Sequence, residues 1–189
     1  MTEQELLQDC LRRLGGAGLG YMLVGSMAGN YWGIPRSTHD IDFVIQYQES
    51  DVKRIVALFE EDFFIQEISV RSALRPPHQF NAIDERSAFK VDFFRLSDDP
   101  YGKIQFERRR ALTLFGEPAF IAAPEDVILY KFLWYTISPS ERQLSDITGI
   151  WSVSGSELDL EHMRHWAKQL GVAQWMDRLE RGELIPKAT

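Results

Sequence analysis

The sequence predicts a mixed α/β unit followed by a helical region. Apolar runs of strand length alternate with segments of helical period as far as about residue 120. From Pro124 onward only helical periodicity remains. The 189 residues, 44% of them hydrophobic, are enough to bury one large core or one core with a small appendage. We therefore expect a small mixed sheet with flanking helices in residues 1–120 and a helical C-terminal region in residues 121–189.

The individual elements follow from apolar spacing and from turn residues. Helices are predicted at 6–14, 27–32, 52–59, 101–109, 124–135, 140–151, 159–170 and 172–181. Strands are predicted at 21–24, 41–47, 63–70, 89–96 and 111–115, where β-branched and aromatic residues gather. Residues 71–86 predict no element, and Gly116-Glu117-Pro118 predicts a turn. Cys10 falls on the apolar side of the first helix, which favours a packed core thiol.

Composition excludes several classes of protein. The net charge of −7 argues against non-specific binding to duplex DNA, which needs a positive surface. A single cysteine excludes an intramolecular disulfide and, with only four histidines, leaves no thiolate zinc cluster. The N-terminus lacks the features of a secretory signal, and no apolar stretch reaches the roughly 18 to 20 residues of a membrane span. We expect a soluble, cytoplasmic protein with no membrane partner.

A glycine and a serine separate the strand at 21–24 from the following helix. Gly25 allows another group to approach the backbone closely, and the free amides at a helix start can hold a phosphate. The Ser26 hydroxyl can cap this helix or donate to a phosphate oxygen. Taken alone, a turn with a helix cap is an equally ordinary explanation of these two residues.

Three aspartates are candidates for a metal site. In a strand, Asp40 and Asp42 point to the same face because side chains alternate with a period of two. Two like charges so close favour a cation between them, and hard carboxylate oxygens suit Mg²⁺ or Mn²⁺. Asp92 lies in the middle of an otherwise apolar strand, where a charge must be compensated. It either joins the other two carboxylates, if the strands are neighbours, or pairs with Lys90 or an arginine.

These residues resemble the nucleotidyltransferase superfamily of the polymerase-beta type. Its signature is Gly-Ser after a strand, then Asp-x-Asp on the next strand and a later third carboxylate. Here 13 residues separate Ser26 from Asp40, at the upper end of the family's range. One bacterial branch of the superfamily, related to abortive-infection and toxin–antitoxin nucleotidyltransferases, has the motif Gly-x-x-Arg-x-Thr-x-Asp-Ile-Asp. This motif resembles the segment Gly33-Ile-Pro-Arg36-Ser-Thr38-His-Asp40-Ile-Asp42.

The same resemblance implies roles for residues later in the chain. That branch carries a lysine on a helix after a Glu-Asp pair, and then an arginine and an aspartate. Lys131 and Asp146 match these positions, and Arg36 is a candidate for contacting a nucleotide phosphate. The alternatives are ordinary ones: Lys131 as a solvated lysine, Asp146 as the partner of Arg142, and Arg36 as a salt bridge that fixes its loop.

The resemblance implies a nucleotidyltransferase-like fold and a two-metal transfer of a nucleoside monophosphate from an NTP, with release of pyrophosphate. Asp40, Asp42, Asp92 and Lys131 would be catalytic, the three aspartates holding Mg²⁺, while Gly25, Ser26, Arg36 and Asp146 would bind nucleotide. The acceptor is left open among RNA, protein and small molecules, as are a homo-oligomer and an antitoxin partner. Two other functions are left open: a catalytically silent nucleotide- or partner-binding module, and the toxin of a toxin–antitoxin pair. The run Arg108-Arg109-Arg110 either attracts RNA or opposes the dipole of its helix.

Overall fold

The contacts of the chain group its residues into two units. The structure is a computed structural model, and it describes residues 1–186. Unit 1 comprises Met1–Met27 and Thr38–Ala122, and unit 2 comprises Ala28–Ser37 and the chain from Ala123 onward. The sequence predicts two contiguous domains, 1–120 and 121–189, whereas the structure adds the segment 28–37 to the helical unit.

Unit 1 is built on a mixed sheet of seven strands in the order β3-β4-β5-β2-β1-β7-β6. The strands are β1 Gly20–Leu23, β2 Ile41–Gln46, β3 Phe63–Phe64, β4 Gln79–Asp84, β5 Lys90–Arg95, β6 Arg110–Leu114 and β7 Glu117–Ile121. β2 pairs with β5, and β1 with β7, in parallel, while the other neighbours are antiparallel. The predicted α/β class with a mixed sheet and flanking helices is therefore confirmed.

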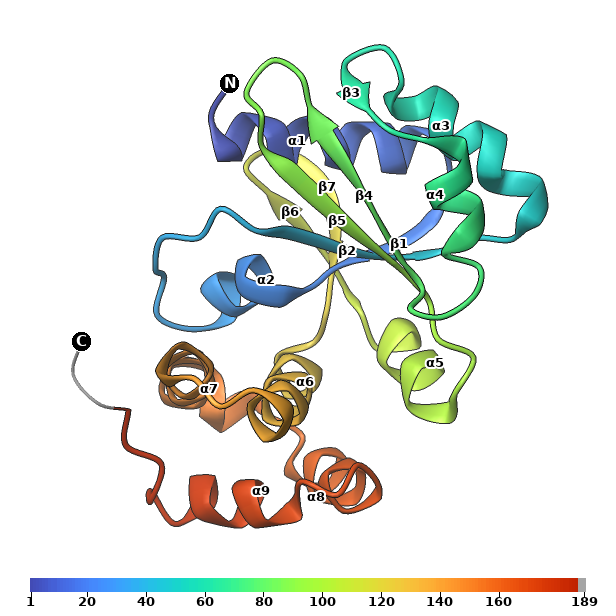
Figure 1. The fold of residues 1–189 in the computed structure, drawn as a ribbon. Helices are drawn as coiled ribbons and strands as arrows, with labels where there is room; N and C mark the ends of the chain where they lie inside the picture. The colour runs from blue at the N-terminus through green and yellow to red at the C-terminus, as the bar shows by residue number, and fades with distance from the viewer. Residues whose placement is uncertain (187–189) are drawn as a thin grey trace. The chain divides into compact units, whose positions relative to one another are not determined.

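One face of this sheet holds the core of unit 1. The helices of the unit are α1 Glu3–Gly16, α3 Val52–Phe59, α4 Glu67–Ser72 and α5 Pro100–Glu107, with a 3₁₀ turn at Glu49–Asp51; α2 (Gly25–Trp32) begins in unit 1. α1, α3 and α4 lie over the same face (Figure 1). Phe43 of β2, Phe93 of β5 and Phe59 of α3 are fully buried there, and their rings are in contact. The alternate residues of β2 and β5 consequently point to the opposite face.

The core also contains Cys10 of α1, which is fully buried. Burial raises the pKa of its thiol far above the usual value, so the thiolate is suppressed at neutral pH. The prediction of a packed, unreactive cysteine is thus confirmed.

Three predictions within unit 1 are wrong. The strand expected at 63–70 stops at Phe64, and residues 67–72 form α4, since short apolar segments fit either element. β4 occupies part of 71–86, where no element is predicted. β7 begins at Glu117, inside the predicted turn. β4 escapes prediction because its inward side chains include Asp84, fully buried against Arg86, while Ile83 points outward.

Unit 2 is helical, as predicted. Its helices are α6 Pro124–Ile137, α7 Glu141–Ser154, α8 Leu160–Gln169 and α9 Ala173–Glu180, with a 3₁₀ turn at Gly155–Glu157. Ser140 and Asp159 cap α7 and α8 with their side chains. In the part of the chain that the structure describes, every helix is too short or too polar to cross a membrane.

Close packing at a glycine and several hydrogen bonds hold the segment 28–37 within unit 2. A side chain on Gly33 would overlap the backbone of Gly149 and Ile150 in α7. The Ser154 hydroxyl donates to the Trp32 carbonyl at 2.7 Å. Asn30 exchanges two hydrogen bonds with the backbone of Arg36, which closes the loop between them. The segment that carries Arg36 is therefore held against α7.

Candidate functional site

Asp42 and Asp92 lie next to each other on neighbouring strands. The parallel pairing of β2 and β5 places the two residues in direct register, so their Cα atoms are about 4.8 Å apart. Both point to the face opposite the aromatic core. Asp92 is 8% exposed, and Asp40 is an exposed residue just before β2. The strand pairing on which the predicted carboxylate cluster depends is therefore present.

Gly25 brings the start of α2 against the Asp42 carboxylate. The Val24 amide donates to the Asp42 carbonyl at 2.9 Å, which holds the end of β1 beside β2. Gly25 then has a φ of +64°, and a Cβ at this position would overlap the carboxylate of Asp42. α2 begins at Gly25, so Ser26 lies in its first turn rather than at the expected cap position. The helix start and the carboxylates are thus immediate neighbours.

We expect the substitution Gly25→Ala to destabilise unit 1. The positive φ and the overlap with Asp42 should together cost about 1–3 kcal/mol of unfolding free energy. Denaturant unfolding measures this cost directly. The control is Gly15→Ala in α1, where the added methyl group meets no atom within 4 Å and should be neutral or stabilising. Equal stability of the two variants would show that the backbone at Gly25 tolerates a side chain.

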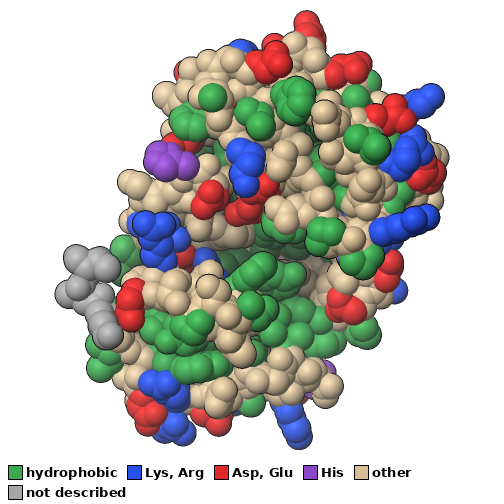
Figure 2. Space-filling view, in the orientation of Figure 1, with side chains coloured by type: hydrophobic (Ala, Val, Ile, Leu, Met, Phe, Trp, Pro, Cys, Tyr) green, Lys and Arg blue, Asp and Glu red, His purple; other side chains and the backbone are tan. Residues whose placement is uncertain are grey.

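Lys90 supplies a positive charge to this cluster. Its Nζ lies 2.6 Å from Asp92 Oδ2. The hydrogen bond to Asp92 raises the pKa of the Lys90 ammonium; burial opposes this rise, and the charges of Asp92, Asp40 and Asp42 support it. The Asp92 charge is therefore compensated by Lys90, the second alternative that the sequence leaves open. Figure 2 shows basic and acidic side chains lying together on the face of unit 1 toward the viewer.

The carboxylates of Asp40, Asp42 and Asp92 are ligands that suit a hard divalent ion, although they do not form a complete metal-binding site in the structure. Among residues 1–186, no three His, Cys, Asp or Glu side chains are grouped closely enough to hold a metal ion. Asp42 and Asp92 are nevertheless adjacent in register, with Asp40 two residues before Asp42. Their chemistry fits Mg²⁺. The Lys90 ammonium partly neutralises the carboxylate charges that a bound metal ion would otherwise neutralise.

Removal of the Lys90 charge should make the protein more dependent on divalent ions. In Lys90→Gln, we expect the melting temperature in EDTA to fall slightly, since the ion pair is half exposed and contributes about 1 kcal/mol or less. The increase in melting temperature on adding MgCl₂ should then exceed that of the wild type. Lys53→Gln, on the exposed side of α3, makes the same change in net charge as a control. Identical MgCl₂ effects in all three proteins would argue that the carboxylates do not bind the ion.

A second charged cluster lies within unit 2. The Asp146 carboxylate accepts hydrogen bonds from Arg36 Nε at 2.7 Å and Arg36 Nη2 at 2.8 Å, and from Lys131 Nζ at 2.7 Å. The side chains of Lys131 and Asp146 are 8% and 5% exposed. Two cations share one carboxylate, so the cluster has a net positive charge at neutral pH. The structure thus brings together three predicted residues that are up to 110 positions apart.

The charges in this second cluster hold Asp146 ionised. Burial by itself raises the pKa of the Asp146 carboxyl, but the hydrogen bonds from Arg36 and the charge of Lys131 outweigh burial and keep the pKa below its ordinary value. Two of the ordinary explanations for these residues are wrong. Lys131 is buried rather than solvated, and Asp146 pairs with Arg36 and Lys131 rather than with Arg142. The third explanation, a salt bridge from Arg36, is observed.

Comparisons with known proteins identify the fold. No protein-family model matches the sequence, and no curated protein is significantly similar to it. Among solved structures, an antigenic nucleotidyltransferase-like protein from Paracoccidioides brasiliensis has a TM-score of 0.67 and 17% identity, over 96% of this chain and 89% of that one.

Two further solved structures have related folds. The antibiotic-resistance factor ANT(2'')-Ia, in complex with adenylyl-2''-tobramycin, has a TM-score of 0.61 and 15% identity, over 89% of this chain and 98% of that one. A putative nucleotidyltransferase from Thermotoga maritima has a TM-score of 0.52 and 16% identity, over 73% of this chain and 88% of that one. The predicted nucleotidyltransferase-like fold is therefore confirmed, and this chain has the fold that these nucleotidyltransferase-like proteins share.

Proposed function

We propose that the protein transfers a nucleoside monophosphate from an NTP to an acceptor hydroxyl and releases pyrophosphate. The observation that carries the proposal is the register of Asp42 beside Asp92, with the glycine at the start of α2 against the Asp42 carboxylate. A cluster of like charges next to the amino end of a helix suits a phosphate chain and its counter-ions. The nucleotidyltransferase-like neighbours support the same reaction class.

In the proposed reaction, the acceptor oxygen forms a bond to the α-phosphorus while the bond from that phosphorus to the pyrophosphate oxygen breaks. Asp40, Asp42 and Asp92 would hold Mg²⁺ or Mn²⁺, and the bound ions would lower the pKa of the acceptor hydroxyl and neutralise phosphate charge. Asp92 accepts the hydroxyl proton. The Gly25 and Ser26 amides bind phosphate oxygens of the leaving pyrophosphate.

We assign nucleotide-binding and catalytic roles in unit 2 to residues that carry positive charge. Arg36 binds phosphate oxygens, and Lys131 offsets the charge that develops on the leaving group. Asp146 orients both side chains, since it accepts hydrogen bonds from each of them. Because phosphoryl transfer depends mainly on placement and charge neutralisation, these roles need no covalent intermediate.

Incubation of the purified protein with each α-labelled NTP and a cell extract tests the proposal. We expect one NTP to label one size class of acceptor, and chelation of divalent ions to prevent the labelling. ANT(2'')-Ia was solved with a nucleotide ester of an aminoglycoside, which makes a small-molecule hydroxyl the first acceptor class to examine. Absence of label from RNA, protein and small molecules alike would contradict transfer.

The ion pair between Lys90 and Asp92 favours a second candidate, a module that binds a nucleotide or a partner without transferring anything. A lysine that compensates a carboxylate lets the acidic cluster persist without a metal ion. Calorimetry with an NTP and Mg²⁺ separates the two functions: tight binding without label transfer assigns the silent module. The toxin–antitoxin role and the homo-oligomer stay predictions. Growth arrest on expression, relieved by a change at Asp42, would support the toxin.

A further inference from the structure

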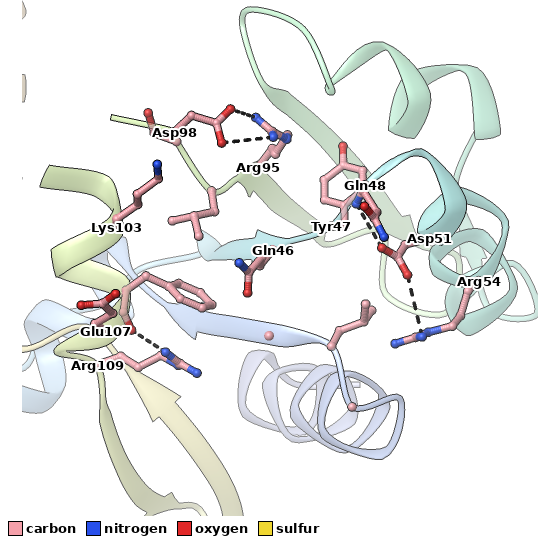
Figure 3. A pocket seen from close by; sticks show the side chains of 16 residues that line it. Gln46, Tyr47, Gln48, Asp51, Arg54, Arg95, Asp98, Lys103, Glu107 and Arg109 are labelled. Atoms are coloured by element: carbon pink, nitrogen blue, oxygen red, sulfur yellow. Dashed lines mark hydrogen bonds and ion pairs between the residues drawn. The ribbon is translucent and has the colours of Figure 1, made fainter. Parts of the chain in front are cut away.

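A second concave site lies in unit 1 at the other end of β2. It is an open cavity of about 920 Å³, lined by the chain ahead of β1, the ends of β2 and β5, the start of α3 and the helix α5 (Figure 3). Gln46 of β2 faces this cavity. Asp42 and Gln46 are four residues apart on one strand, so their Cα atoms are about 13 Å apart. The cavity is therefore distinct from the carboxylate cluster.

The lining of this cavity is more basic than the protein as a whole. Four cationic side chains, Arg54, Arg95, Lys103 and Arg109, face three carboxylates in a chain whose net charge is −7. Arg95 is paired with Asp98 at 2.9 Å, and Arg54 lies 3.8 Å from Asp51. Within residues 1–186, Lys103 and Arg109 form no such close ion pair, although the hydrogen bond from Arg95 and, to a smaller extent, the charge of Lys103 lower the pKa of Asp98. Among the described residues, no carboxylate lies within 4 Å of Lys103 Nζ or of the Arg109 guanidinium.

Arg109 is the more strongly uncompensated of these two cations. Its Nη1 donates to the Phe106 carbonyl at 2.5 Å, and its guanidinium lies over the Phe106 ring. Partial burial lowers the pKa of this guanidinium, whose side chain stays partly exposed to the cavity. The Nε atoms of Arg95 and Arg109 are buried without a hydrogen-bond partner among residues 1–186. Buried polar atoms without a partner carry a desolvation cost.

From this geometry we infer that the cavity binds a small phosphorylated molecule with at least two negative charges. Lys103 and Arg109 provide the charge, and Arg side chains match phosphate geometry well. Gln46, Gln48 and Ser97 line the cavity with neutral polar groups suited to the polar body of such a ligand. The volume is that of a small-molecule site. A long RNA is disfavoured because the protein is acidic overall.

The inference also accounts for part of the basic run at residues 108–110. Only Arg109 of the three arginines lines the cavity. Glu107, one turn after Lys103 on α5, lines it too and would repel an anion. Lys103 and Glu107 carry opposite charges on the same helix, so neutralising each should change anion affinity in opposite directions. A purely structural role of these residues would not produce this pair of opposite effects.

Titration of the protein with sodium tripolyphosphate in EDTA, followed by calorimetry, tests this site. Without metal, the carboxylate cluster repels a polyanion. Binding at the Arg36 and Lys131 cluster would not respond to changes at Lys103 and Arg109, so the cavity variants distinguish this site from the proposed transfer site. We expect saturable binding, weakened about tenfold by the double change Lys103→Gln and Arg109→Gln and tightened about twofold by Glu107→Gln. Lys53→Gln, an exposed lysine outside the cavity, should leave the affinity unchanged.

Three outcomes would overturn the inference. The first is the absence of saturable binding to the wild-type protein. The second is an equal loss of affinity in the cavity variants and in Lys53→Gln, which would indicate a general charge effect. The third is binding of a single-stranded RNA oligonucleotide but not of tripolyphosphate. Melting temperatures of all variants, measured in the same buffer, confirm that each protein is folded.

Discussion

Replacement of Asp42 by asparagine is expected to abolish label transfer from the α-labelled NTP while leaving the melting temperature equal or higher. Asparagine keeps the shape of the side chain but removes one of the charges that would hold the metal ions. The loss of activity should be at least about a hundredfold, as for other groups that stabilise charge during reaction. The gain or maintenance of stability follows because a carboxylate beside Asp92 and Asp40 repels its neighbours.

The matched control for Asp42→Asn is Asp177→Asn, on the exposed side of α9, which makes the same change in net charge. This control should retain full transfer and the melting temperature of the wild type. Wild-type transfer by Asp42→Asn would remove the carboxylate cluster from the mechanism. A variant that unfolds, with or without metal, would assign Asp42 a structural role instead.

The largest effect on stability is expected for Asp146→Ala. This change leaves the buried Lys131 ammonium without its carboxylate and should cost about 3–5 kcal/mol of unfolding free energy. For a chain of this length, the corresponding fall in melting temperature is about 10 °C. The double variant Lys131→Met, Asp146→Leu should recover part of the loss, because it removes the buried ammonium as well. Arg36, whose side chain is 28% exposed, still loses its carboxylate partner in this variant.

The same cluster should show a defined pH dependence. The pKa of the Asp146 carboxyl is lower in the folded than in the unfolded protein. Its contribution to stability is therefore complete above the unfolded pKa of about 4 and is lost as the pH falls through the lower, folded pKa. The stability difference between wild type and Asp146→Asn should shrink below about pH 4. Glu180→Gln removes the exposed ion pair with Arg164 and should cost about 1 kcal/mol or less. A similar cost for Asp146→Asn would show that its ion pairs are weak.

Much of the fold could be predicted from the chain. The helices of unit 2 follow from apolar spacing and from caps such as Ser140 and Asp159, which act over three or four residues. The strands β2 and β5 follow from β-branched and aromatic runs. The failures occur where distant contacts override local pattern. Residues 67–72 form a helix although Ile68 and Val70 favour a strand, and Asp84 occupies an inward strand position because Arg86 neutralises it.

In the candidate site, too, features that depend on neighbouring residues could be predicted, and features that depend on distant contacts could not. Strand alternation alone places Asp40 and Asp42 on one face, and the absence of a side chain at Gly25 allows another group to approach its backbone closely. Nothing local predicts that Lys90 compensates Asp92 more closely than an arginine does, or that α5 and the end of β2 enclose a basic cavity. The cavity gives no sequence signal because its lining residues come from separate stretches of chain between residues 18 and 109.

By itself, the chain determined the type of most elements, the buried cysteine, and the carboxylates and glycine that carry the proposed chemistry, because these depend on periodicity and on backbone sterics over a few residues. Tertiary structure alone decided that Asp92 stands in register with Asp42, that Lys131 is buried, and that Arg36 meets Asp146 across 110 positions. Register and burial arise from the packing of whole elements, whose partners lie far apart in the chain, and no local pattern encodes them.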